Sequence, residues 1–316
     1  MNSDYTLGLH QVADDTWAWL QPDGGWGWSN AGLVADDAGS LLVDTLFDLK
    51  LTAAMLEGMR AAVPAAAGIS TVVNTHANGD HCFGNPLLAA EGATIVTSTA
   101  SAAEMEEVPA STLAGLVMAG DTLGPGGAFA KRIFSAFDFD GISPTPATQT
   151  FDGSLRLDVG TTVDLLEVGP AHTRGDVVVH LPERGVAFTG DIVFNGGHPI
   201  VWSDLRGWVR ACDAVVALDP AVVVPGHGPL TDLGAVRFLQ QYLLDVEGEA
   251  RARYNRGLSA VDAARELHAT MPERWRHLGE AERLVVNMAA AYRSFGAEGE
   301  LGMLGLFDAM AALADA

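Results

Sequence analysis

Apolar and polar positions alternate through the first 46 residues in the way that β-strands require. Residues 46–63 instead have the spacing of an amphipathic helix, which Pro64 ends. The strands expected in this part of the chain are residues 16–20, 30–34, 40–43 and 69–73. Strands that alternate with helices predict an α/β layer.

Residues 99–141 break this rhythm. Two helical stretches, 100–107 and 111–118, precede the sequence Gly-Pro-Gly-Gly at 124–127, which we expect to be flexible. Phenylalanines follow. An aromatic-rich insertion between two β regions often covers a pocket, although its phenylalanines are equally compatible with a place in the core.

β character returns from residue 148, and the chain is mainly helical after residue 235. The strands expected here are residues 148–151, 154–157, 162–167, 177–181, 186–189 and 221–224. No linker is long enough to separate independent domains. The sequence therefore predicts one domain over residues 1–316, with a helical and aromatic insertion at 99–141 and a C-terminal helical extension at 235–316.

Composition narrows the class of protein. Of the 316 residues, 48% are hydrophobic, which is enough for a sizeable core, and no apolar run reaches the ~20 residues that span a bilayer. The net charge is −22, from 40 acidic and 18 basic side chains, and this field repels polyanions. We therefore expect neither a nucleic acid nor a membrane partner.

Two features bear on the compartment. The first residues lack the basic and apolar regions of a signal peptide, and two cysteines, Cys82 and Cys212, do not make a disulfide framework. A cytoplasmic protein is the expectation.

The run from His76 to His81 directly follows the expected strand 69–73 and carries two imidazoles, an amide and a carboxylate. Zinc and similar ions prefer imidazole nitrogen and carboxylate oxygen. His172, Asp191 and His227 each follow another expected strand. Loops at strand ends build the active sites of sheet enzymes. The candidate metal-binding residues are His76, Asn78, Asp80, His81, His172, Asp191 and His227.

These residues, with Asp44 and the Pro-Gly-His-Gly sequence at 225–228, resemble the metallo-β-lactamase fold superfamily over about residues 10–235. The resemblance implies an αββα sandwich of two mixed β-sheets with a metal site at one edge. It also implies zinc, as one or two ions, with iron and manganese accepted by the same ligands.

The resemblance assigns roles to the candidates. His76, His172 and residue 78 would form a first metal position, Asp80, His81 and His227 would form a second, and Asp191 would bridge them. The family usually has histidine where this chain has Asn78, and an amide oxygen is a weak ligand for zinc. We therefore expect a tight second position and a weakened first one. Asp44 is expected to orient loop backbone or a ligand.

A narrower resemblance covers most of the chain. Residues 137–141, 169–176 and 272–293 are similar to a group of actinobacterial proteins of this fold that includes the cyclase/thioesterases of aromatic polyketide pathways. Many members of that group have no assigned substrate.

The chemistry follows from an ion with an open coordination position, which lowers the pKa of bound water toward ~7. The resulting hydroxide attacks a carbonyl carbon of an ester, thioester, lactone or amide. Asp80 and Asp191 are the candidate catalytic residues, which hold the hydroxide or carry its proton. The same Lewis acid can stabilise an enolate, which aldol ring closure requires.

The candidate substrate-binding residues share an aromatic or polar side chain near the motifs: Trp26, Trp28, Phe137, Phe139, Arg174, His198 and Trp202, with Phe134 and Phe194 as further wall residues. Aromatic walls suit a flat or apolar acyl group. Core packing is the alternative for the aromatic residues, and a structural role is the alternative for Arg174.

Three functions remain open: a metal-dependent hydrolase for a small-molecule acyl substrate, a polyketide cyclase/thioesterase, and a binding protein on a degenerate metallo-β-lactamase fold. The apolar stretch at residues 301–314 also offers a face for a second subunit, so a homodimer is a further expectation.

Overall fold

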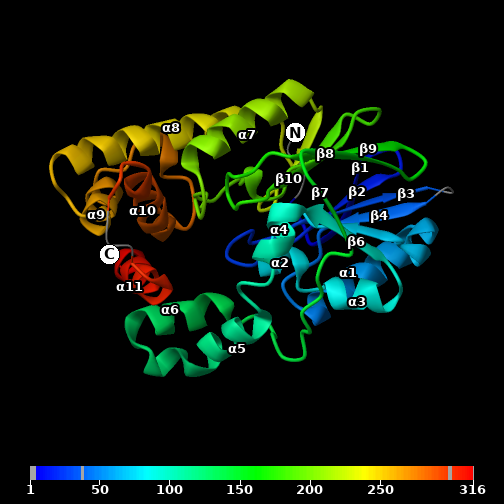
Figure 1. Ribbon diagram of the computed structural model, residues 1–316, viewed down its shortest axis with the longest axis horizontal. Helices are drawn as coiled ribbons and strands as arrows, with labels where there is room; N and C mark the ends of the chain where they lie inside the picture. The colour runs from blue at the N-terminus through cyan, green and yellow to red at the C-terminus, as the bar shows by residue number, and fades with distance from the viewer. Residues whose placement is uncertain (1–4, 37–38, 298–300, 316) are drawn as a thin grey trace.

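Two β-sheets lie face to face at the centre of the fold, with helices on both outer sides (Figure 1). This is a computed structural model, and it describes residues 5–36, 39–297 and 301–315. The helix–sheet–sheet–helix order confirms the predicted αββα sandwich.

The first sheet has seven strands in chain order. They are β1 (Gly8–Ala13), β2 (Thr16–Leu20), β3 (Ala31–Ala35), β4 (Ser40–Val43), β5 (Thr71–Val73), β6 (Thr94–Ser98) and β7 (Gln149–Phe151). The pairs from β1 to β4 are antiparallel, and those from β4 to β7 are parallel. The carboxyl ends of β4, β5 and β6 therefore meet at one edge of the sheet.

The second sheet has the strand order β12-β11-β10-β9-β8. Its strands are β8 (Ser154–Asp158), β9 (Thr162–Glu167), β10 (Val177–Leu181), β11 (Val186–Phe188) and β12 (Val222–Val224). Only β11 and β12 pair in parallel, so their carboxyl ends share an edge.

Three apolar layers hold the sandwich together. Between the sheets, side chains such as Val73 and Val96 pack against Leu165 and Val179. Outside the first sheet, α1 (Leu49–Ala62) and α3 (Asn85–Ala90) cover a second layer. Outside the second sheet, α7 (Leu205–Leu218) and α8 (Leu233–Asn255) cover a third. Strands β3, β4, β10 and β11 are buried along their whole length, which explains their continuous apolar sequences.

The remaining α-helices are the short α2 after β5 and those of the insertion and of the C-terminal part. They are α2 (Gly79–Cys82), α4 (Thr99–Glu104), α5 (Ala110–Ala119), α6 (Gly124–Phe134), α9 (Ala260–Ala269), α10 (Leu284–Ser294) and α11 (Met303–Ala314). Far apart in sequence, α6 and α11 lie side by side (Figure 1). None of the helices in the described part of the chain combines the length and the apolar character that crossing a membrane requires.

The expectation of a flexible segment at residues 124–127 is wrong, because these residues form the first turn of α6. Pro125 stands in that first turn, where its missing N–H is not needed. The Gly126 backbone N–H donates to Asp308 Oδ1 at 2.6 Å, and a Cβ on Gly126 would lie 2.5 Å from the Asp308 backbone nitrogen. Glycine is required here by the close approach of α11.

Candidate metal centre

Four loops at strand ends bring the candidate ligands to one edge of the sandwich. His76 follows β5, and Asp80 and His81 lie on the short helix α2 that comes next. His172 lies between β9 and β10, Asp191 follows β11, and His227 follows β12. All six side chains are buried, with at most 8% of each residue exposed.

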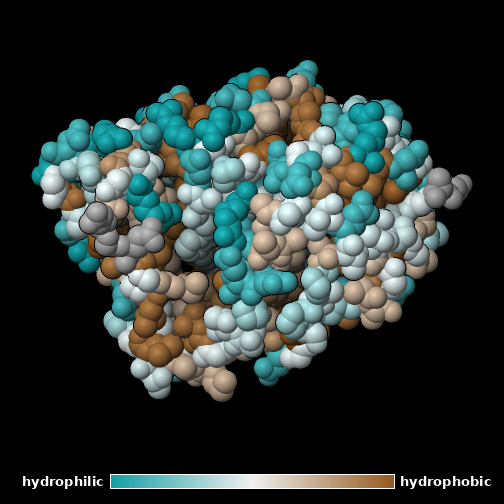
Figure 2. Space-filling model, viewed as in Figure 1, coloured by the Kyte–Doolittle hydropathy of each residue, from teal (hydrophilic) through white to brown (hydrophobic). Residues whose placement is uncertain are grey.

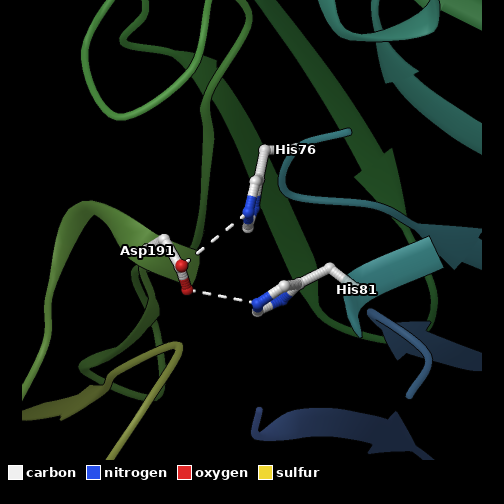
Figure 3. A group of neighbouring side chains, drawn as sticks. All are labelled: His76, His81 and Asp191. Carbon is white, nitrogen blue, oxygen red and sulfur yellow. Dashed lines mark ion pairs between the residues drawn. The ribbon is translucent and has the colours of Figure 1, made fainter. Parts of the chain in front are cut away.

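The carboxylate of Asp191 lies between two pairs of histidines. Its Oδ2 is 3.9 Å from His76 Nε2 and 3.4 Å from His172 Nε2. Its Oδ1 is 3.1 Å from His81 Nε2 and 3.5 Å from His227 Nε2. Figure 3 shows His76 and His81 pointing toward this carboxylate. Each oxygen of Asp191 thus faces a different pair of imidazoles, which is the arrangement of a bridging group.

Asp80 lies beside the second pair of histidines, His81 and His227. Its Oδ2 lies 3.3 Å from His227 Nε2 and 3.9 Å from His81 Nε2. Donor atoms lie within 4.8 Å of one another in two groups of three, His76–His81–Asp191 and Asp80–His81–His227. His81 belongs to both groups. Its ring therefore lies near His76 in one group and near Asp80 and His227 in the other.

All four imidazoles are oriented through their Nδ1 atoms. His81 Nδ1 donates to Asp44 Oδ2 at 2.9 Å, and His76 Nδ1 lies 3.0 Å from Thr75 Oγ1. The other two Nδ1 atoms contact backbone carbonyl oxygens, His172 that of Ile200 at 2.7 Å and His227 that of Trp28 at 3.1 Å. With Nδ1 as the protonated nitrogen, each Nε2 keeps a lone pair toward the centre.

Asp44 has the orienting role expected from the sequence. Its carboxylate accepts the Thr75 backbone N–H and the Thr75 hydroxyl, both at 2.7 Å, in addition to the His81 ring. One buried carboxylate therefore fixes the loop after β5 and the direction of an imidazole.

The turn that carries His227 approaches Asp191 very closely. A Cβ on Gly226 would lie 2.0 Å from Asp191 Oδ1. The Gly226 backbone N–H donates to the Gly190 carbonyl oxygen at 2.8 Å. Only glycine allows this approach, which sets His227 opposite His81.

Three carboxylates and two histidines dominate the electrostatics of the centre. Burial alone would lower the pKa of His81, but Asp191, Asp44 and Asp80 together raise that pKa well above its usual value. The pKa of His227 is raised to about 9, because Asp191 and Asp80 outweigh its burial. Burial would raise the pKa of Asp191, yet His227 and His81 hold it well below the usual range. The carboxylates thus favour positive charge at the centre, which either a proton or a metal ion can supply.

The donor atoms fit a metal ion of the zinc type. His76 Nε2, His81 Nε2 and Asp191 Oδ1 are buried and make no hydrogen bond with any described residue. Burying such atoms without a partner costs free energy. Imidazole nitrogens and carboxylate oxygens that converge in this way are the donor set of zinc and related ions.

Asn78 occupies a different environment from the imidazoles. Its Nδ2 lies 3.0 Å from His172 Nε2, so the amide donates to the lone pair that would otherwise face a metal. Since His172 Nδ1 is also engaged, both ring nitrogens of His172 have partners within the protein.

A cavity of about 280 Å³ opens onto Asp80, Asp191 and His227. Its walls are mainly aromatic or apolar: Trp26, Phe47, Phe83, Leu113, Phe134, Phe194, Ile200, Trp202 and Phe307. Of the aromatic candidates, Trp26, Phe134, Phe194 and Trp202 line this cavity. Trp28, Phe137 and Phe139 do not, because Trp28 packs on Phe137 and both phenylalanines pack on Phe47.

Two further candidates lie elsewhere. Arg174 is half-exposed and pairs with Glu107 at 2.5 Å and Glu104 at 3.6 Å, outside the residues that line the cavity. His198 is fully buried, and its Nδ1 lies 2.8 Å from Tyr242 Oη. Packing, and not substrate contact, accounts for the position of His198.

Several residues that line the cavity are not among the candidates from the sequence. Phe83 follows the motif directly, and this adjacency was a usable signal. Phe307 and Arg283 come from the C-terminal helices and carry no local signal. The Arg283 guanidinium lies over Trp26, 4.5 Å from the ring centroid, and donates to the His198 carbonyl oxygen at 2.9 Å.

Known proteins share this fold and parts of this sequence. A segment of 98 residues is 32% identical to an uncharacterized protein of Mycobacterium tuberculosis (strain ATCC 25618 / H37Rv), covering 28% of this chain and 44% of that protein. Another of 87 residues is 31% identical to 2,4-dinitroanisole O-demethylase subunit alpha of Nocardioides sp. (strain JS1661), covering 26% of each. These matches span less than half the length of either relative.

Solved structures extend the likeness to most of the chain. The metallo-beta-lactamase from Pontibacter korlensis superposes with a TM-score of 0.55 at 20% identity, covering 76% of this chain and 99% of that one. FIM-1 from Pseudomonas aeruginosa, in its mono-zinc form, gives a TM-score of 0.55 at 21% identity over 76% and 97%. At these identities the structures show the fold alone. A family model for the metallo-beta-lactamase superfamily matches residues 24–227, and the chain belongs to that superfamily.

Proposed function

We propose that this protein is a metal-dependent hydrolase that cleaves an ester, thioester or lactone carbonyl bearing an apolar or aromatic acyl group. The observation that best supports this proposal is the aromatic-walled cavity, which opens directly onto Asp80, Asp191 and His227. Members of the superfamily are generally hydrolases, and the donor set here fits a metal ion.

The ion would be held by Asp80, His81, Asp191 and His227. Three of these side chains also line the cavity, so this position is open to substrate. At the other position, the Asn78 amide already engages His172 Nε2 at 3.0 Å. We therefore propose one ion per chain, and the mono-zinc form of FIM-1 is a solved example with this fold. Zinc suits these ligands best, and iron and manganese are the alternatives.

When bound, such an ion supplies Lewis acidity, which activates water near neutral pH and stabilises negative charge on a carbonyl oxygen. The protein's own groups do the rest. Asp80 lies at the cavity wall and takes the proton from the attacking water, then returns it to the leaving group. Trp26, Phe194 and Trp202 hold the acyl group and exclude bulk water.

The direct test uses one aromatic acyl thioester and the zinc-loaded protein, with the products weighed by mass spectrometry. Hydrolysis gives the free acid and the free thiol, whose masses together exceed that of the thioester by one water. Asp80→Asn keeps the size of the side chain but removes both the proton acceptor and a charged ligand of the ion, so we expect its kcat to fall by about 10²-fold or more. Full activity in this variant, or no hydrolysis by the native protein, refutes the proposal.

The same experiment addresses ring closure. A poly-β-keto thioester that loses water without release of the free acid would indicate cyclisation in place of hydrolysis. The cavity and the Lewis-acid position are common to both reactions, so the products decide between them.

A further inference from the structure

The rim of the aromatic cavity carries more carboxylates than cations. Glu104 and Glu107 both line the cavity near the end of α4. They share a single guanidinium, because Arg174 lies 2.5 Å from Glu107 Oε1 and 3.6 Å from Glu104 Oε1. One positive charge between two carboxylates leaves this part of the rim negative.

The cation among the residues that line the cavity is already neutralised. Arg283 is 2% exposed, and its Nη2 lies 2.9 Å from Glu280 Oε2. Its Nη1 donates to the His198 carbonyl oxygen. These partners fix the guanidinium over Trp26 and leave no surplus charge for an anion.

The wider rim is apolar or acidic. Val108 and Met303 line the cavity and remain 39% and 50% exposed. Figure 2 shows apolar surface over α6 and α11, beside a hydrophilic strip that runs toward α4. On the neighbouring α6, Lys131 and Arg132 pair with Asp121 and Asp315. The basic side chains nearest to these elements are therefore engaged with carboxylates.

The charges inside the site would be balanced as well. The two carboxylates among its ligands, Asp80 and Asp191, match the charge of one divalent ion. Outside, the net charge of −22 gives the protein a field that on the whole repels anions. A substrate with phosphate groups would meet this repulsion both on approach and at the rim.

From this charge distribution we infer that the site selects uncharged substrates: a free aromatic or apolar ester, lactone or small thioester, in preference to the same acyl group on a phosphate-bearing carrier such as coenzyme A. The inference rests on the proposed hydrolase function and defines its substrate class.

The test compares two thioesters of 2-naphthoic acid that differ only in the thiol, one uncharged (N-acetylcysteamine) and one phosphate-bearing (coenzyme A). With zinc-loaded protein at low ionic strength, we expect kcat/KM to be at least about tenfold higher for the uncharged thioester. This ratio should shrink as salt is added, because screening weakens repulsion.

Binding gives a second readout that needs no turnover. Trp26 and Trp202 line the cavity, so the matching non-hydrolysable thioethers should quench tryptophan fluorescence. The uncharged thioether should bind more tightly, and only the coenzyme A thioether should gain affinity with salt.

A variant pair locates the effect at the rim. Glu107→Gln removes one negative charge from the rim. It should raise kcat/KM for the coenzyme A thioester, relative to kcat/KM for the uncharged thioester, about twofold. Glu57→Gln changes the net charge equally, but Glu57 is an exposed residue of α1, on the outer side of the first sheet. That control should leave the ratio unchanged.

The outcomes separate the two claims. If coenzyme A thioester is cleaved as fast as the uncharged one, or if the preference ignores salt, the inference on charge is wrong while the hydrolase function stands. If the protein cleaves neither thioester and binds neither thioether, the proposed function fails, and the inference fails with it.

Discussion

At the scale of single residues, the proposal of one ion per chain rests on Asn78 and His172. His172 has partners at both ring nitrogens, Asn78 Nδ2 at 3.0 Å and the Ile200 carbonyl oxygen at 2.7 Å. His76 Nε2 and His81 Nε2 face Asp191 but make no hydrogen bond with any described residue. The unsatisfied donors therefore concentrate around Asp191 and His81, and the first position lacks an imidazole.

Replacing Asn78 restores the missing imidazole. We predict that Asn78→His raises the zinc content from about one to about two ions per chain, because the new ring no longer donates an amide N–H to His172. Atomic emission on purified, dialysed protein measures the content. Asn78→Gln, which keeps the amide, is the matched control and should stay near one. An unchanged content in Asn78→His would contradict this account of the first position.

Asp44 acts through another residue. Asp44→Asn removes the acceptor that orients His81, so we predict a loss of zinc affinity of about 10- to 100-fold, measured by competition with a chromogenic chelator. Asp48→Asn removes a buried carboxylate that caps α1 and should leave the affinity unchanged. Equal losses in the two variants would mean that Asp44 supports folding only.

The ligands could be predicted residue by residue because each follows a recognisable strand. Arg283 and Phe307 could not, since nothing near them in the sequence relates them to residues 76–81. His198 was misjudged for a similar reason. His198 follows Asp191 closely in the chain, but its partner Tyr242 lies on α8. This contact holds the His198 side chain in the core.

At the scale of elements, α6 and α11 form one wall of the cavity through Phe134 and Phe307. Their rings are 6.3 Å apart between centroids. The close approach depends on Gly126, which has no room for a side chain beside Asp308. Packing between two distant segments thus sets the shape of the cavity beside Asp80 and Asp191.

A pair of glycine variants tests this contact. Gly126→Ala should destabilise the protein by about 1–3 kcal/mol, because the new methyl group would overlap Asp308. Gly115→Ala on α5 has open space around it and should stabilise by about 0.4–1 kcal/mol. Urea denaturation measures both. Similar changes in the two variants would show that α6 and α11 do not pack as described.

Strand and helix positions were largely predictable from periodicity, since each element buries one face. The start of α6 was not, because four residues rich in glycine indicate flexibility until the partner helix is known. The four-residue α2 is too short for any periodic signal, and the ligands that it carries were found by residue type alone.

At the scale of the whole molecule, burial of a neutral histidine links folding to pH. Burial lowers the pKa of His198 from its ordinary value of 6.5 to about 3. Below pH 6.5 the unfolded chain takes up a proton that the folded protein does not. The contribution of His198 to the free energy of unfolding is therefore fully present above pH 6.5. It falls by at most about 1.4 kcal/mol per pH unit as the pH is lowered toward 3.

We predict that His198→Gln, which can still bond Tyr242, flattens this fall between pH 6 and pH 4. Chemical denaturation at a series of pH values gives the slope. The exposed His277→Gln should keep the slope of the native protein. A native slope in His198→Gln would place the pH dependence in other groups.

The αββα arrangement was predictable at this scale, because five motifs in family order define it. The contact between residues 99–141 and the C-terminal helices was not predictable, because neither segment has a sequence pattern that indicates the other as its partner. That contact adds Phe307 and Met303 to the cavity and gives it its apolar mouth. The homodimer expected from residues 301–314 stays a prediction, although α11 buries Phe307 and Met310 within its own chain.

The central claim is that one metal ion at the Asp80–His81–Asp191–His227 position drives hydrolysis. The most direct measurement adds zinc stepwise to metal-free protein and follows cleavage of the uncharged 2-naphthoic thioester. We predict that activity rises in proportion to added zinc and stops rising at one equivalent per chain. Activity that is independent of zinc, or that appears only with the second equivalent, would contradict the account.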